Sequence, residues 1–192
     1  MSLVRSLALA ALLGAASLPA DAALPEGHPA PVFTAQASQA GKAFSYSLDD
    51  ALKRGPVVVY FYPAAFTSGC SLEAQAFAEN LDRFTAAGAT IVGVSLDPIA
   101  RLNEFSADPK TCAGKFAVAS DADGRIAKSY DLAVREASAG RADNRGAPIE
   151  HGLVERATFV VGSDGRIAAS LTGLGPLDNV EKALAAVERL KR

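Results

Sequence analysis

The chain is poor in the residues that build metal and redox centres. Its 192 residues contain no Trp, one Met, two His and two Cys. The cysteines, Cys70 and Cys112, form no C-x-x-C pair, which argues against a disulfide oxidoreductase. His28 and His151 lie far from each other and from either cysteine, so we expect no zinc site. No haem, nicotinamide or phosphate-loop motif is present either, and we expect no cofactor.

The chain also lacks a cluster of charge of one sign. It carries 19 Lys and Arg against 21 Asp and Glu, for a formal net charge of −2, and these residues are scattered along the sequence. A nucleic-acid surface or a polybasic membrane patch would need basic residues gathered together. We therefore expect no nucleic-acid partner.

The N-terminus holds the only long apolar stretch. "MSLVRSLALAALLGAASLPADA" (1–22) has one early charge, Arg5, then an Ala/Leu-rich run that closes on the A-x-A pattern Ala20-Asp21-Ala22. This pattern predicts a secretory signal peptide cleaved after Ala22, because the run is short for a bilayer span. An uncleaved membrane anchor is the alternative. We expect residues 23–192 to form one exported domain, periplasmic or secreted, with no stable membrane insertion after cleavage.

Apolar runs and turn residues alternate through the rest of the chain. "PVVVYFY" (56–62) is continuously apolar and β-branched, as in a strand covered on both faces. Further strands are expected at 89–96 and 115–120, with a hairpin over 156–173 and a Pro-rich lead-in (24–35) that pairs with 42–48. Helices are expected at 47–55, 67–87, 98–108, 121–132 and 177–192, and a long exposed loop at 136–154. This order predicts an α/β, thioredoxin-like three-layer sandwich with a mixed central sheet.

Cys70 occupies a position at which a thiol could be reactive. Pro63 ends the 56–62 strand, and the cysteine then falls in the first turn of the 67–87 helix, seven residues before the inward-facing Phe77. Exposed N–H groups at a helix start favour the thiolate, the nucleophilic form. A buried and inert cysteine fits the same position, so both interpretations stay open on position alone.

The sequence around Cys70 resembles the peroxidatic signature of the peroxiredoxins, P-x-x-x-T/S-x-x-C, read here as Pro63, Thr67 and Cys70. Glu73 resembles the acidic residue that follows in many members. "ERATFVVGSDGRI" resembles the segment that carries the family's active-site arginine, here Arg156. The resemblance covers about residues 28–190 and is strongest to the bacterioferritin-comigratory (Q) branch.

This resemblance implies a thiol-dependent peroxidase with a role in antioxidant defence. Cys70 would attack hydrogen peroxide or an organic hydroperoxide, Arg156 would favour the thiolate and Thr67 would orient the peroxide. Pro63 would shape the pocket and Glu73 would organise the arginine. Each residue also has a purely structural interpretation. Thr67 could be only the helix N-cap and Pro63 only the end of the strand. Arg156 could be a surface cation, and Glu73 an acid that favours the helix start. A thioredoxin-like or small-thiol reductant is implied as partner, and we expect a monomer or weak dimer.

The resolving cysteine departs from the family pattern. Many members of the Q branch carry one five residues after the peroxidatic cysteine, where this chain has Gln75. Cys112 is the remaining candidate, and an intramolecular disulfide would need its Cα within about 7 Å of that of Cys70. We expect the 67–70 turn to unwind locally for this. The alternative is a one-cysteine enzyme in which Cys112 is incidental.

Other classes fit the sequence less well. An exported copper chaperone of thioredoxin fold needs C-x-x-x-C, but the positions four residues from Cys70 are Phe66 and Ala74. A glutathione-peroxidase-like enzyme relies on Gln and Trp, and the chain has no Trp. A non-catalytic binding module remains as the last alternative.

Overall fold

The computed structural model describes residues 23–191. The predicted signal peptide, residues 1–22, lies outside the described residues, so its cleavage after Ala22 stays a prediction. In the described part of the chain, no helix is both long enough and apolar enough to cross a bilayer.

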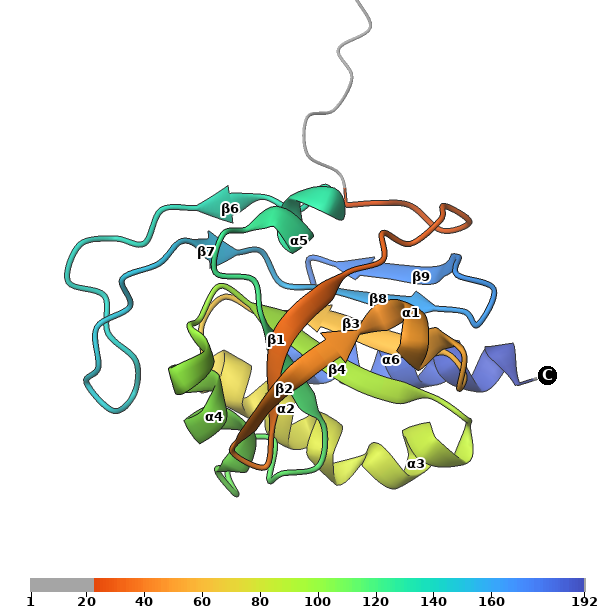
Figure 1. Ribbon diagram of the computed structural model, residues 1–192, viewed down its shortest axis with the longest axis horizontal. Helices are drawn as coiled ribbons and strands as arrows, with labels where there is room; N and C mark the ends of the chain where they lie inside the picture. Colours follow the sequence, from red (N-terminus) through yellow and green to blue (C-terminus); the bar gives the residue numbers. More distant parts are fainter. Residues whose placement is uncertain (1–22, 192) are drawn as a thin grey trace, which may run out of the picture.

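A seven-stranded mixed sheet forms the centre of the fold, in the order β2-β1-β5-β4-β3-β8-β9 (Figure 1). Three neighbouring strands run parallel, and the remaining pairs are antiparallel. The parallel strands are β3 (Val57–Phe61), β4 (Thr90–Ser95) and β5 (Ala117–Ser120). The others are β1 (Thr34–Gln39), β2 (Lys42–Ser47), β8 (Ala157–Val161) and β9 (Ile167–Thr172).

Two apolar cores lie on opposite faces of this sheet, because successive side chains of a strand point to opposite sides. On β3, Val58 and Tyr60 belong to one core, while Val57, Val59 and Phe61 belong to the other. The fully buried β3 explains why its sequence is continuously apolar.

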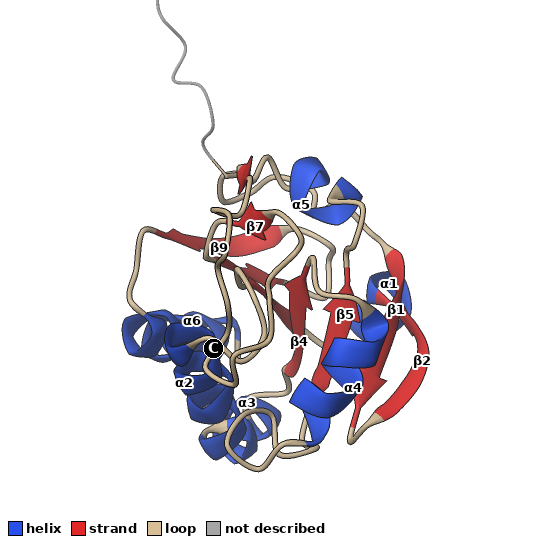
Figure 2. Cartoon of the chain, turned by 90° about the vertical axis from the view of Figure 1, so that its left-hand side faces the viewer, coloured by secondary structure: helices blue, strands red, loops and turns tan. Residues whose placement is uncertain are grey.

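Helices cover both faces and complete the predicted three-layer α/β sandwich. The first core is packed by α2 (Ser68–Glu79), α3 (Leu81–Ala86), α4 (Ile99–Ala107) and α6 (Pro176–Leu190). The second is packed by the short α1 (Leu48–Leu52) and α5 (Arg125–Ser129). Figure 2 shows α2, α3 and α6 grouped together, with α4 lying against β5 and β1.

Three predicted elements differ in detail from the structure. The 67–87 helix is broken at Asn80, whose side-chain amide donates to the carbonyl of Ala76, and α3 starts after it. The hairpin partner of the 42–48 strand is β1, so only the end of the 24–35 lead-in, Thr34 and Ala35, takes part in the predicted pairing. The 136–154 loop is not wholly exposed: Asp143 and Ile149 are buried, and β7 (Leu153–Val154) at its end pairs with β6 (Val134–Arg135), which directly precedes it.

Candidate active site

Cys70 lies beyond the carboxyl end of β3. β3 ends at Phe61, and the chain turns through Pro63 into α2, whose N-cap residue is Thr67. Cys70 follows in the first helical turn and is 2% exposed. The prediction that the thiol sits at a helix start and faces inward is confirmed, since Phe77 on the same helix is also buried.

Arg156 reaches this thiol because of the pairing between β3 and β8. Ala157, the first residue of β8, lies opposite Phe61, the last residue of β3. Arg156 precedes β8 directly and therefore stands beside the start of the connection that leads to Cys70. Its Nη2 lies 3.4 Å from Sγ of Cys70. The arginine is thus no free surface cation but a hydrogen-bond donor to the sulfur.

Glu73 occupies the other side of the same guanidinium. Its side chain is fully buried, and its Oε2 accepts a hydrogen bond from Nη1 of Arg156. Burial raises the pKa of Glu73 to about 7, although the nearby Arg156 opposes the rise. Because one guanidinium contacts both Glu73 and Cys70, the carboxylate fixes the direction in which the arginine approaches the sulfur.

Asn179, on α6, completes this chain of contacts and was missed by the sequence analysis. Its Nδ2 donates to Oε1 of Glu73 at 2.8 Å, and the residue is 1% exposed. The hydrogen bond favours the charged carboxylate and so lowers the pKa of Glu73 against the effect of burial. The sequence shows only a polar residue beside the inward-facing Val180, which by itself gives no sign of this role.

The side chain of Thr67 bonds to the backbone of the segment that connects β3 to α2. Its hydroxyl donates to the carbonyl of Ala64 at 2.9 Å and forms no capping bond to the helix N–H groups. Thr67 is therefore the N-cap residue by position, as the structural interpretation proposed, but its side chain does not cap the helix. The hydroxyl oxygen keeps acceptor capacity in this arrangement.

Gly69 leaves space for the arginine. A Cβ built on this glycine would lie 3.4 Å from Nη2 of Arg156 and 3.5 Å from Cγ of Pro176. A larger side chain here would crowd the guanidinium at the point where it approaches Cys70.

Cys112 lies on a turn after α4, fully buried, and both cysteines are free thiols. Nζ of Lys115, in the same turn, donates to the carbonyl of Ala78 near the far end of α2 at 2.9 Å. Ala78 stands eight residues after Cys70, which corresponds to about 12 Å along a helix. Burial also raises the pKa of the Cys112 thiol, so the thiolate is disfavoured there.

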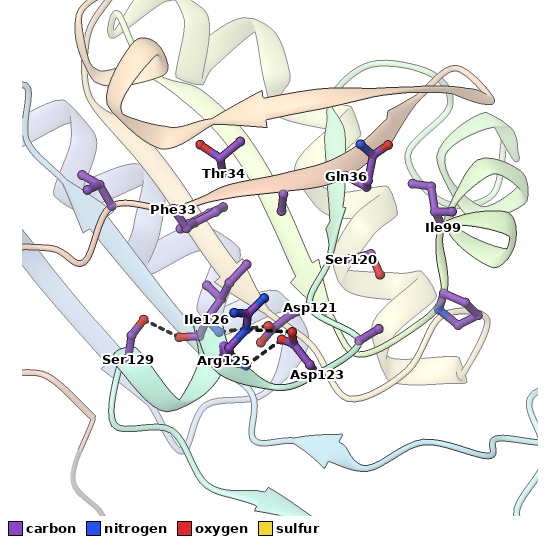
Figure 3. A pocket seen from close by; sticks show the side chains of 14 residues that line it. Phe33, Thr34, Gln36, Ile99, Ser120, Asp121, Asp123, Arg125, Ile126 and Ser129 are labelled. Carbon is purple, nitrogen blue, oxygen red and sulfur yellow. Dashed lines mark hydrogen bonds and ion pairs between the residues drawn. The ribbon is translucent and has the colours of Figure 1, made fainter.

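Two further features of residues 23–191 bear on what the site could hold: possible metal ligands and a surface hollow. Within residues 23–191, no group of three or more His, Cys, Asp or Glu side chains is placed to hold a metal ion. A hollow of about 860 Å³ lies against β1 and α5, with Phe33, Gln36 and Ile126 among its lining residues (Figure 3). Its lining includes neither Cys70 nor Arg156, so the hollow is separate from the thiol site.

Comparison with known proteins shows the family of the chain. Residues 27–170 match the AhpC/TSA family. The chain belongs to this family. It is 38% identical over 107 residues to a chloroplastic peroxiredoxin Q of rice (Oryza sativa subsp. japonica). That match covers 56% of this chain and 46% of the relative, so the chain spans about half the length of this relative. A putative peroxiredoxin of Mycobacterium tuberculosis is 30% identical over 141 residues, 73% of this chain and 82% of the relative.

Solved peroxiredoxin structures share the fold. The peroxidoxin BcpB of Mycobacterium tuberculosis superimposes with a TM-score of 0.72 at 26% identity, covering 86% of this chain and 97% of that one. A peroxiredoxin Q of Xanthomonas campestris gives a TM-score of 0.67 at 24% identity, covering 83% and 92%, and bears on the fold alone. The thioredoxin-like fold and the peroxiredoxin resemblance, including its Q-type branch, are thus confirmed.

Proposed function

We propose that the protein is a thiol-dependent peroxidase in which Cys70 is the peroxidatic nucleophile. The observation that carries this is the position of Arg156, with one guanidinium nitrogen on Glu73 and the other 3.4 Å from Sγ of Cys70. A buried carboxylate that holds an arginine against a thiol places a cationic hydrogen-bond donor on the sulfur, which a structural cysteine does not need. The names of the relatives, peroxiredoxin Q among them, support the same assignment.

The proposed reaction begins with attack of the Cys70 thiolate on one peroxide oxygen, in line with the O–O bond. The sulfur–oxygen bond forms as the O–O bond breaks, and the other oxygen leaves and takes up a proton as water or an alcohol. Cys70 is oxidised to a sulfenic acid and the peroxide is reduced. Arg156 stabilises the charge that develops on the oxygens. Thr67 orients the peroxide through its hydroxyl, and Pro63 shapes the surface around the sulfur.

For the return half of the cycle, we propose that Cys112 attacks the sulfenic acid and forms a Cys70–Cys112 disulfide with loss of water. A thioredoxin-like or small dithiol then reduces this disulfide, and its own two thiols become the new disulfide. The route requires the first turn of α2 and the 108–116 segment to rearrange, because Cys70 and Cys112 are both buried and Lys115, three residues after Cys112, donates to the carbonyl of Ala78 near the far end of α2.

Burial of Cys112 favours a second route, in which an external thiol condenses directly with the sulfenic acid of Cys70. Intact mass and non-reducing peptide maps after one equivalent of peroxide separate the two routes. Loss of two hydrogens with a Cys70–Cys112 peptide supports the disulfide. Gain of one oxygen on Cys70, with the same product in Cys112→Ser, supports the external thiol.

The central proposal is tested by peroxide consumption with Cys70→Ser. Reduced wild-type protein should consume one equivalent of hydrogen peroxide or of an organic hydroperoxide without added thiol, and Cys70→Ser should consume none. Cys112→Ser is the matched control, since it removes the other thiol and should keep the first oxidation. An unchanged rate in Cys70→Ser would refute the proposal.

We also propose that the working form is an exported domain, residues 23–192, that acts as a monomer or weak dimer in antioxidant defence. The A-x-A pattern at 20–22 supports export. N-terminal sequencing of the protein from the exported fraction should begin at Ala23, and light scattering should give the mass of one or two chains. An N-terminus at Met1 in a membrane fraction would favour the uncleaved anchor.

A further inference from the structure

Phe66, the residue directly before Thr67, has an unusual backbone. Its φ is +62°, in the left-handed region that residues other than glycine rarely adopt. The residue is buried and its ring packs edge-on against Phe105, with ring centroids 5.1 Å apart. Such a conformation persists only where neighbouring groups hold it, so the contacts of Phe66 indicate what fixes the connection that leads to Cys70.

The 143–145 turn supplies several of these contacts, although it is far away in the sequence (between β6 and β7 in Figure 1). The backbone N–H of Asn144 donates to the carbonyl of Phe66 at 3.1 Å. The guanidinium carbon of Arg145 lies 3.3 Å from the centroid of the Phe66 ring, at stacking distance. The hydroxyl of Ser68, at the start of α2, donates to Oδ1 of Asn144 at 3.1 Å.

The 143–145 turn is held in place by the carboxylate of Asp143. The buried carboxylate of Asp143 accepts hydrogen bonds from the N–H groups of Arg145 and Ala147, at 2.8 and 2.9 Å. It also forms an ion pair of 2.7 Å with Nη2 of Arg101, which donates to the carbonyl of Ala65 at 3.3 Å. The ion pair between Asp143 and Arg101 and the hydrogen bonds around it therefore link the turn to residues 65 and 66, between β3 and α2.

We propose that the 143–145 turn, through Arg145 and Asn144, is a positioning element for the peroxide reaction. It keeps Phe66 left-handed and thereby sets how Thr67 and the first turn of α2 present the Cys70 sulfur. The inference rests on the proposed peroxidase function. When the turn releases Phe66, the connection opens: Cys70 becomes more accessible, and its alignment with Arg156 is lost.

Opposite changes in two rates test this. In Arg145→Ala, the second-order rate of the first oxidation of Cys70 by hydrogen peroxide should fall about five- to tenfold, because the stacked cation is lost. The rate at which iodoacetamide alkylates Cys70, followed by peptide mass, should rise. Arg141→Ala is the matched control, since Arg141 is exposed on the same loop and its removal changes the net charge equally. Arg145→Lys keeps a cation beside the ring and should restore much of both rates.

The outcomes separate the turn from the chemistry. If Arg145→Ala matches Arg141→Ala in both rates, the turn does not position the loop and the proposal fails. It fails equally if oxidation and alkylation slow together, as the loss of a thiolate-stabilising charge would produce. If wild-type protein consumes no peroxide, the proposed peroxidase function fails instead. The alkylation rates then decide alone whether the turn holds the connection: a faster rate in Arg145→Ala supports it and an unchanged rate refutes it.

Discussion

Nη2 of Arg156 lies 3.4 Å from Sγ of Cys70, although the two residues are 86 positions apart in the chain. The contact is made possible by the pairing of β3 with β8, which brings the residue before β8 to the end of β3. The Cys70 thiol and the Arg156 guanidinium are therefore attached to two neighbouring strands of one sheet. The chemistry proposed for the thiol depends on this relationship, and the predictions below test its parts.

Replacing Arg156 by Lys tests the geometry of the guanidinium apart from its charge. A lysine keeps the positive charge but cannot contact Glu73 and Cys70 with two coplanar nitrogens. We expect the peroxide reaction to slow about 100-fold, the usual loss when one transition-state donor is removed. Stopped-flow oxidation of the reduced protein measures this. Arg125→Lys, at an exposed ion pair, should react like wild type; an unaffected rate in Arg156→Lys would contradict the role.

Thr67→Val tests the hydroxyl. Valine keeps the shape of threonine but removes the group that donates to Ala64 and could accept from the peroxide. We expect the oxidation rate to fall at least tenfold, as for loss of one reacting-group hydrogen bond. Thr67→Ser, which keeps the hydroxyl, should retain most of the rate. Equal rates in the valine and serine variants would leave Thr67 with a structural role only.

The pH dependence of the peroxide reaction should reflect the protonation of Glu73. Burial raises the pKa of this carboxyl to about 7, so it takes up a proton as the pH falls through that value and its ion pair with Arg156 is lost. We therefore expect the ratio of wild-type to Glu73→Gln oxidation rates to rise between pH 6 and pH 8. Using a ratio cancels the titration of other groups. A ratio that stays constant over this range would show that the charge on Glu73 does not matter.

The same shift predicts a stability difference of known sign. A carboxyl whose pKa is raised on folding binds its proton more tightly in the folded state. Its contribution to stability is fully present below the ordinary value of 4.5 and is lost as the pH rises through about 7. The free energy of unfolding of Glu73→Gln, relative to wild type, should therefore increase from pH 5 to pH 8. Urea unfolding at several pH values measures this, and a relative decrease would contradict it.

Asn179→Leu tests the hydrogen bond behind Glu73. Loss of the amide donor should raise the pKa of Glu73 further, since the bond from Nδ2 favours the carboxylate. The pH at which the peroxide reaction gains its Glu73-dependent rate should then move upward from that of wild type. Asn80→Ala removes an amide at the break between α2 and α3 and serves as control. A shift in Asn80→Ala as large as that in Asn179→Leu would assign the effect to general packing.

The sequence predicted the sheet and the connection that carries Cys70 because both leave local patterns. A continuous apolar run marks β3, and the order of Pro63, Thr67 and Cys70 marks the connection that follows it. The distances among Arg156, Glu73 and Cys70 could not be predicted, since they arise from strand pairing between distant segments.

The missed parts share a physical reason. Asn80 breaks the expected helix through a side-chain bond that competes with the helical pattern, which an apolar stripe does not reveal. The buried part of the 136–154 loop is held by Asp143, whose partners lie within the loop and on α4. A polar, Gly-rich sequence gives no local sign that it contacts Phe66.

The antiparallel register of β8 on β3 also limits where the chain can accept inserted residues. Moving the strand by one residue would turn every β8 side chain to the opposite face and take Arg156 away from the sulfur. Insertions inside residues 157–161 should therefore abolish peroxide turnover. Added residues at the 163–165 tip of the β8–β9 hairpin, by contrast, lengthen a surface turn and leave the register intact. Related sequences should thus differ in length at this tip while the arginine keeps its place one residue before the strand.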